Sequence, residues 1–223
     1  MGLVHGGIPK VLARRIRDAC RAEVFIETGT YKGDTAAWAA GEFRQVFTIE
    51  VDPALHAAAK ERLSSFHTVT CLLGDCRATL EALLPTLAGK RALIWLDAHH
   101  CGNEDRDSPL LEEIELINKT LPDAAILIDD ARFILSPVDG RRLCTLSALV
   151  RTLDCDDPRR ELVVVEDVIV AVPLEADAEL DAYCREVTRA DWDRQQDVLK
   201  WKKTVSGRIL KKMQSMAGCP CRY

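Results

Sequence analysis

Acidic residues stand directly after short apolar runs at several places in the first 130 residues. Carboxylates at such positions can bind hydroxyl groups, amino groups or metal ions, and they can take up a proton. Because parallel strands bring their carboxyl ends to one edge of a sheet, we expect these acids to share a crevice. The acids are Glu27, Glu50, Asp75, Asp97, Asp129 and Asp130.

The segment VFIETGTYKGDT, residues 24–35, predicts an apolar strand, an acid and then a turn into a helix. Gly29 and Gly33 would let the backbone of this turn approach a ligand closely. The spacing differs from the G-x-G-x-x-G of dinucleotide-binding proteins. Glu27 would repel a diphosphate and would favour the amino group of a zwitterionic ligand. A tight turn that uses glycine for structural reasons alone is the alternative.

Two further acids fit a nucleoside. Glu50 ends an apolar run about 20 residues after the glycine turn, where a ribose-binding carboxylate belongs in a doubly wound fold. Asp75 follows Leu72-Leu73-Gly74 and could bond an adenine amino group. It could equally cap a helix that begins at Cys76. Both interpretations of Asp75 stay open at this point.

The remaining acids favour a metal site. Asp97, Asp129 and Asp130 would lie close together, and like charges in a cleft destabilise one another unless a cation or proton intervenes. Their oxygens are the ligands that Mg²⁺ or Ca²⁺ prefers. Alternatively, Asp129 or Asp130 caps the next helix or pairs with Arg132.

His99 and His100 directly follow this region and could supply a general base. A metal ion beside one of them would lower the pKa of an acceptor hydroxyl. Adjacent side chains point in different directions, so we expect at most one catalytic histidine. A hydrogen-bonded surface histidine is the alternative. Cys101 lacks the strand-to-helix elbow of a thiol nucleophile, which disfavours that role.

Alternating elements would position these residues. Strands separated by helices imply right-handed crossovers and a parallel sheet. The apolar runs at 162–165 and 168–172 are too close for a crossover and should pair antiparallel. The sequence therefore predicts a Rossmann-like, doubly wound α/β fold with a mostly parallel seven-stranded sheet and an antiparallel last strand. We expect strands near 23–28, 45–50, 68–73, 91–97 and 124–129, and helices near 8–21, 34–41, 54–64, 76–87, 109–120 and 142–153.

The chain has 223 residues, and 48% of them are hydrophobic, which suffices for the core of one α/β domain. We assign this domain to residues 1–173 and a mainly helical, basic extension to residues 174–223, with Gly207 as an expected break. The net charge of −5 argues against a protein that coats nucleic acid. From Val198 onward, however, seven Lys or Arg occur and no acid. This tail could contact phosphate groups or an anionic membrane, or it could be a solvated helix face.

Nine cysteines form an odd, scattered set, which disfavours a disulfide framework. Cys219 and Cys221 are too few ligands for a zinc site of their own. The chain has no run of about 18 apolar residues, and its first residues lack the layout of a secretory signal. We therefore expect no membrane span and a cytoplasmic location.

Taken together, these motifs resemble the class I S-adenosylmethionine-dependent methyltransferases. The likeness extends from about Val24 to Val172 and is carried by ETGTYKG, TIEVDP, the GD after the third strand and the acid that ends the fourth. WLDAHH and ILIDDAR resemble bacterial methyltransferase-like proteins and, in layout, metal-dependent O-methyltransferases that act on sugars of natural products. The resemblance implies S-adenosylmethionine as cofactor, bound by Glu27, Gly29, Thr30, Gly33, Thr35, Glu50, Val51, Asp75, Cys76 and Asp97.

The metal-dependent group further implies Mg²⁺ or another divalent cation on Asp97, Asp129 and Asp130. Asp97 and His99 or His100 would then be catalytic, and the acceptor would be a small molecule such as a sugar or another natural product. The tight G-x-G turn of many methyltransferases is here Gly29-Thr30-Tyr31-Lys32-Gly33, which leaves the contacts to the methionine portion open. A nucleotide-dependent oxidoreductase and a non-catalytic module that binds nucleic acid or an acidic partner are the alternatives. A homo-oligomer stays open.

Overall fold

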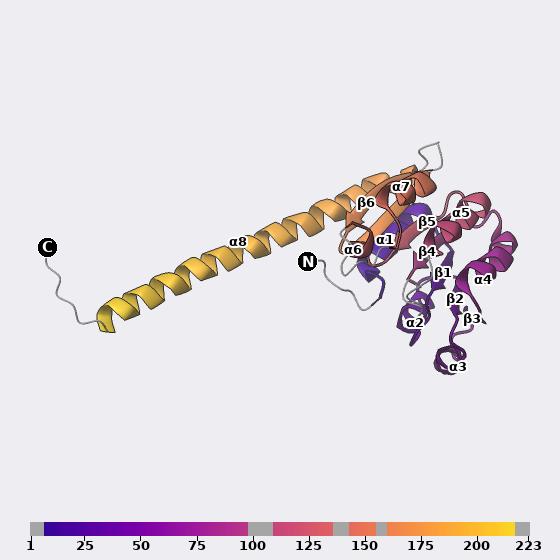
Figure 1. Ribbon diagram of the computed structural model, residues 1–223, viewed down its shortest axis with the longest axis horizontal. Coiled ribbons are helices and arrows are strands. Elements are labelled where there is room, and N and C mark those ends of the chain that lie inside the picture. Colours follow the sequence, from indigo (N-terminus) through magenta and orange to yellow (C-terminus); the bar gives the residue numbers. More distant parts are fainter. Residues whose placement is uncertain (1–6, 98–108, 136–142, 155–159, 217–223) are drawn as a thin grey trace. The chain divides into compact units, whose positions relative to one another are not determined.

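The computed structural model describes residues 7–97, 109–135, 143–154 and 160–216 (Figure 1). The chain divides into two compact units, Met1–Leu180 and Asp181–Tyr223. The first unit contains a sheet with its helices, and the second contains most of the long helix α8 (Asp177–Met216). The domain boundary that we place at residue 173 from the sequence stays a prediction.

A seven-stranded sheet lies at the centre of the first unit, in the order β3-β2-β1-β4-β5-β7-β6. Strands β1 to β5 are parallel, whereas β7 pairs antiparallel with both β5 and β6. This confirms the predicted mostly parallel sheet with an antiparallel last strand. The strands are β1 (Val24–Thr28), β2 (Gln45–Glu50), β3 (Val69–Leu73), β4 (Ala92–Leu96), β5 (Ala125–Ile128), β6 (Arg160–Val165) and β7 (Val168–Pro173).

The strand order reverses beside β1, because β2 lies on one side of it and β4 on the other. Chain connections leave this point in opposite directions, so the carboxyl ends of β1 and β4 border the crevice where ligands bind in open α/β sheets. Every residue of β1 and β4 is buried. Burial on both faces explains why β4 and the first three residues of β1 are continuous apolar runs instead of alternating ones.

Helices cover both faces of the sheet (Figure 1). On one face, side chains such as Ile26 and Ile94 pack in a core with residues of α4, α5 and α7. On the other face, the ring of Phe25 contacts Trp38 and Phe43, with ring centroids 6.3 and 5.1 Å apart. Besides the start of α8, the described residues of this unit form α1 (Lys10–Cys20), α2 (Asp34–Ala39), α3 (Pro53–Arg62), α4 (Cys76–Leu83), α5 (Leu110–Thr120), α6 (Arg132–Leu135) and α7 (Leu146–Asp154), with the short 3₁₀ helices η1 (Leu84–Leu87) and η2 (Leu174–Ala176).

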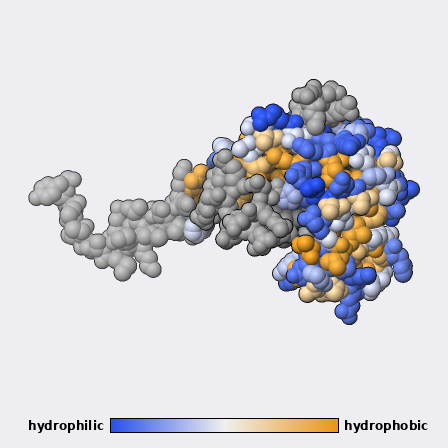
Figure 2. Space-filling view, turned by 45° about the vertical axis from the view of Figure 1, so that its right-hand side comes forward, coloured by the Kyte–Doolittle hydropathy of each residue, from blue (hydrophilic) through white to orange (hydrophobic). Residues whose placement is uncertain are grey.

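Helix α8 continues through Gly207, so the predicted break at this glycine is wrong. Glycine inside a helix costs only about 1 kcal/mol relative to alanine and does not oblige the helix to end. Within the described residues, no helix is long and apolar enough to cross a membrane. On the face of the first unit shown in Figure 2, hydrophobic residues lie among hydrophilic ones.

Candidate functional site

The turn after β1 is held against the end of β2. The backbone N–H groups of Gly29 and Thr30 both donate to the carbonyl of Ile49, at 2.9 and 3.1 Å. Gly29 and Gly33 have φ angles of 86° and 75°, in the left-handed region that favours glycine. A Cβ atom at Gly33 would also lie 3.0 Å from Cδ1 of Leu63. The backbone therefore favours glycine at position 33, and a larger residue there would also have to displace the side chain of Leu63.

A chain of buried hydroxyl groups connects this turn to Glu27. The hydroxyl of Thr48 donates to a Glu27 carboxylate oxygen at 2.7 Å, and the Oγ1 atoms of Thr48 and Thr30 lie 2.6 Å apart. A hydroxyl has one proton to donate. When Glu27 is ionised, Thr48 gives its proton to Glu27, and Thr30 then donates to Thr48. The arrangement links β1, β2 and the turn through polar side chains that are 4% exposed or less.

Burial raises the pKa of Glu27 to about 8. Hydrogen bonds from Thr48 and Thr35 act in the opposite direction, while the negative charges of Asp97 and Glu50 raise the pKa further. A cation placed beside Glu27 would offset both the desolvation of the carboxylate and the repulsion by its acidic neighbours. This carboxyl group is therefore suited to an amino group, as the sequence predicts.

Backbone groups fix the carboxylate of Glu50. The N–H of Tyr31 donates to one of its oxygens at 2.8 Å, and the N–H of Asp52 donates to the other at 3.0 Å. Each carboxylate oxygen has a second lone pair and can still accept from a ligand hydroxyl. Val51, the next residue, is 42% exposed at the same edge. The carboxylate of Glu50 is thus held in place before any ligand binds.

Asp75 is the N-cap of α4, since its carboxylate accepts a hydrogen bond from the N–H of Ala78 at 3.1 Å. Of the two predicted roles, the structure bears out helix capping. The side chain of Cys76 is buried in the core beside α5. A cofactor contact from Cys76 would therefore come from its backbone. Thr35, at the start of α2, is buried as well.

Asp97 and Asp129 follow two neighbouring parallel strands. The N–H of Asp97 donates to the carbonyl of Thr28 at 3.2 Å, and the N–H of Asp129 donates to the carbonyl of Leu96 at 3.1 Å. Burial raises the pKa of Asp97 to about 7, and the negative charges of Asp129 and Asp130 contribute to this shift. Like charges at this edge therefore favour the protonated form of Asp97.

The third predicted metal ligand has a cationic partner. A carboxylate oxygen of Asp130 lies 2.6 Å from Nη2 of Arg132, and Arg132 also forms an ion pair with Asp167. Asp130 has a φ of 58°, and its N–H donates to the carboxylate of Asp129 at 2.7 Å. This pairing is the alternative that the sequence left open. In the part of the chain that the structure describes, no group of three His, Cys, Asp or Glu residues could hold a metal ion.

His99 and His100 lie outside the described residues, so their predicted catalytic roles stay predictions. Asp97 is the last described residue before them. It marks the point at which the chain leaves β4 at the edge shared with Glu27.

No family model and no curated protein matches this chain. Solved structures do. A putative caffeoyl-CoA O-methyltransferase from Staphylococcus aureus has a TM-score of 0.55 at 13% identity, over 77% of this chain and 86% of its own. The O-methyltransferase from Bacillus cereus in complex with SAH matches with a TM-score of 0.54 at 16% identity, over 76% of this chain and 83% of its own. SAM-bound CalS10, an amino pentose methyltransferase from Micromonospora echinaspora, matches with a TM-score of 0.53 at 16% identity, over 74% of this chain and 89% of its own.

The chain has the class I methyltransferase fold. At these identities the likeness concerns the arrangement of the chain alone.

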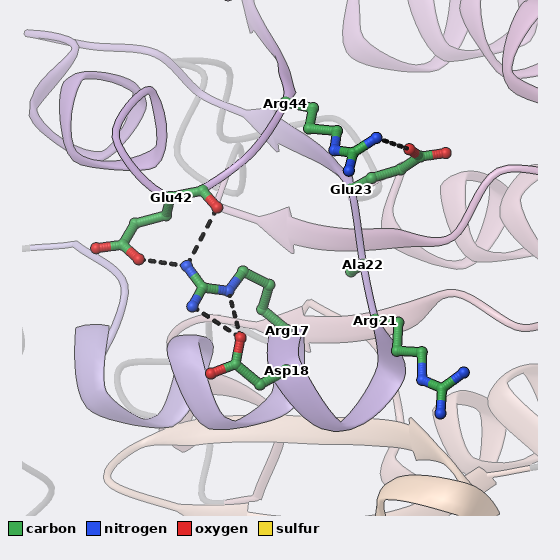
Figure 3. Close-up of a pocket in the computed structure, with 7 residues that line it drawn as sticks. All are labelled: Arg17, Asp18, Arg21, Ala22, Glu23, Glu42 and Arg44. Atoms are coloured by element: carbon green, nitrogen blue, oxygen red, sulfur yellow. Dashed lines mark hydrogen bonds and ion pairs between the residues drawn. The ribbon is translucent and has the colours of Figure 1, made fainter.

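A pocket of about 450 Å³ lies at the opposite edge of the sheet from this site, beside the residues that precede β1 and β2. There, Arg17 lies between Glu42 and Asp18 and forms ion pairs with both (Figure 3). Arg44 lies 3.8 Å from a carboxylate oxygen of Glu23. The amino ends of the strands border this pocket, so its residues belong to packing between α1 and the sheet and not to the candidate site.

One residue of the site, Thr48, and one buried acid on α5, Glu113, were not identified from the sequence. Thr48 lies in the apolar run before Glu50, and it is fully buried. A hydroxyl inside such a run signals that a hydrogen-bond partner must be buried with it. Glu113 on α5 is 1% exposed, and burial, followed by the charges of Asp75 and Glu112, raises its pKa to about 7. The adjacent Glu112 and Glu113 gave no indication of which one faces inward.

Proposed function

We propose that this protein is an S-adenosylmethionine-dependent methyltransferase that methylates a hydroxyl oxygen of a small molecule, such as a sugar or another natural product. The buried chain from Thr30 through Thr48 to Glu27 is the observation that carries the proposal. It places a desolvated carboxyl group beside a glycine turn and next to the fixed carboxylate of Glu50. A ligand with an amino group at one end and ribose hydroxyls at the other matches this pair of acids.

In this proposal Glu27 binds the amino group of the cofactor, and Glu50 accepts from the ribose hydroxyls. The glycine turn lets the backbone approach the methionine portion between them. The cofactor supplies a methyl group that is already activated on a sulfonium, so alignment with the acceptor oxygen contributes much of the acceleration. The remaining contacts predicted from the sequence, at Thr35, Val51, Asp75 and Cys76, lie at the same edge of the sheet.

Asp97 is our proposed general base. Its pKa of about 7 suits a group that must be ionised at neutral pH and still accept a proton from an acceptor hydroxyl. The side chain lies at the end of β4, beside the strand that carries Glu27. His99 or His100 is the alternative base, and which of the three residues acts is decided by the pH profile of each variant.

Metal dependence remains a prediction of this proposal. The repulsion among Asp97, Asp129 and Asp130 favours a divalent cation, but Asp130 already forms an ion pair with Arg132. The described carboxylates therefore do not form the predicted three-acid site by themselves. We derive no step through a metal, and a comparison of turnover with and without EDTA tests the requirement.

Isothermal calorimetry on the whole chain tests the cofactor. We expect S-adenosylmethionine and S-adenosylhomocysteine to bind with and without Mg²⁺, and Glu27→Gln to weaken both. NAD titrated under the same conditions tests the oxidoreductase alternative, and we expect no heat from it. Absence of binding by both S-adenosyl compounds in either condition would reject the methyltransferase proposal.

A further inference from the structure

The charge of α8 changes along its length. In its first half, acids and bases pair within the helix, as Arg185 does with Asp181 and Arg194 with Asp191. Asp197 is the last acid of the chain, and it pairs with Lys200 at 3.3 Å. After this pair the sequence of the helix contains only cations among its charged residues: Lys202, Lys203, Arg208, Lys211 and Lys212.

Apolar side chains are exposed where this change begins. Val198 and Leu199 are each 50% exposed, and Trp201 is 64% exposed. The sequence continues with apolar residues at positions 205, 209, 213 and 216, and the backbone is helical through Met216. Spacings of three and four residues are the repeat of an amphipathic helix. The segment 198–216 therefore combines an apolar repeat with cations and contains no acid.

We propose that residues 198–216 of α8 form an interfacial helix that binds an anionic membrane surface. Aliphatic and tryptophan side chains enter the boundary between headgroups and acyl chains, while lysine and arginine attract anionic lipids. Nucleic acid would use the cations but not the exposed Val198 and Leu199. A second copy of this segment would carry the same unopposed positive charge and be repelled. The segment would lie on the membrane, since the described helices contain no candidate span.

Co-sedimentation of the full chain with vesicles tests this inference independently of the proposed enzyme activity. We expect the protein to sediment with vesicles of phosphatidylglycerol and phosphatidylcholine, but not with phosphatidylcholine alone. High salt should release it, because ionic attraction is screened. The double variant Lys202→Gln, Lys203→Gln should bind these vesicles about thirtyfold more weakly, since each basic residue near an anionic surface strengthens binding by about five- to sixfold.

The matched control is Arg185→Gln, Arg189→Gln, which removes the same charge from exposed positions in the first half of the helix. We expect it to bind vesicles as the unaltered chain does. Trp201→Ala should weaken binding about tenfold. Trp192→Ala should change it little, because Asp191 and Asp193 flank that tryptophan and anionic lipid repels them. Circular dichroism confirms that each variant stays helical.

Three results would overturn the inference. Failure to sediment with anionic vesicles removes the membrane surface as partner, and equal binding to neutral vesicles removes the role of charge. An equal loss of binding in the Arg185, Arg189 control shows that the effect is not specific to residues 198–216. If the chain binds a single-stranded RNA oligonucleotide or dimerises through Trp201 while ignoring vesicles, the segment serves that partner instead.

Discussion

The two halves of the carboxyl edge hold their acids in different ways. At the ends of β1 and β2, hydrogen bonds from the protein itself reach both acids. Thr48 donates to Glu27, and backbone N–H groups donate to both oxygens of Glu50. This half is organised before a ligand arrives.

At the ends of β4 and β5, acids instead face one another. The pKa of Asp97 is raised by burial and by its neighbours Asp129 and Asp130, and Arg132 pairs with Asp130. Both halves therefore contain a buried carboxyl group with a raised pKa, about 8 for Glu27 and about 7 for Asp97. Glu27 also accepts hydrogen bonds from Thr48 and Thr35, which favour its ionised form and suit the binding of a cationic group. Asp97 has two further carboxylates beside it, which favour its protonated form and suit proton transfer.

The largest expected effect comes from the β4 half. Asp97→Asn should lower turnover by about 10²- to 10⁴-fold, because it removes the proposed base. Cofactor affinity should change by less than about threefold, since Glu27 and Glu50 remain. Turnover of the unaltered enzyme should rise with pH through about 7, as Asp97 ionises. Steady-state kinetics with an acceptor found by screening measures both quantities.

Asp123→Asn is the matched control for Asp97, because Asp123 is exposed and precedes β5 at the opposite edge of the sheet. Turnover should stay unchanged in this variant. Full activity of Asp97→Asn, with an unaltered pH profile, would remove Asp97 from the mechanism and leave His99 or His100 as the base.

The β1 half gives the next largest effect. Glu27→Gln should weaken S-adenosylhomocysteine binding by about 30-fold at pH 8.5, because a charge-assisted hydrogen bond contributes on the order of 2 kcal/mol. In the unaltered protein, affinity should rise as pH increases through about 8, since the cofactor's amino group binds ionised Glu27. Calorimetry at several pH values measures this profile, and a flat profile would contradict the role of Glu27.

The same substitution has an opposite effect on unliganded stability. The pKa of Glu27 is raised from 4.5 to about 8 in the folded protein, so its contribution to stability is fully present below pH 4.5 and is lost as pH rises through 8. Above pH 8, the free energy of unfolding of Glu27→Gln should therefore exceed that of the unaltered chain by at most about 5 kcal/mol. Thermal unfolding should show this as a higher midpoint temperature. The difference should vanish near pH 4.

Much of the β1 half, at the ends of β1 and β2, could be predicted from the sequence. Buried parallel strands are continuous apolar runs, and Glu27 and Glu50 end two of them, so their shared edge follows from local patterns. Thr48 could not be assigned a role in this way. A single hydroxyl in a strand has no spacing that names its partners, which here come from β1 and from the turn.

The β4 half, at the ends of β4 and β5, was less predictable for a different reason. Asp129 and Asp130 are adjacent, but the position of Asp130 depends on its ion pair with Arg132. Arg132 in turn pairs with Asp167, in the turn between β6 and β7. A contact across 35 residues leaves no local pattern. The break expected at Gly207 fails for the opposite reason, because a local preference of about 1 kcal/mol is too weak to end a long helix.

The smallest effect tests the chain that links Thr30 to Glu27. Thr48→Val keeps the shape of the side chain but removes its hydroxyl, so S-adenosylhomocysteine should bind about fivefold more weakly, as for one neutral hydrogen bond. The pKa of Glu27 should rise further, because the bond from Thr48 lowers it, and the pH profile of binding should move upward. Calorimetry measures both changes.

Methylthioadenosine, which lacks the amino acid portion, distinguishes positioning from general damage. Its affinity should be the same in Thr48→Val and in the unaltered chain, since Glu50 and the turn at Gly29 still bind the nucleoside. Thr70→Val, at an exposed position of the edge strand β3, serves as the control and should leave both ligands unaffected. If Thr48→Val lowers the affinity for both ligands equally, the hydroxyl chain supports the fold of the turn instead of positioning Glu27 for the amino group.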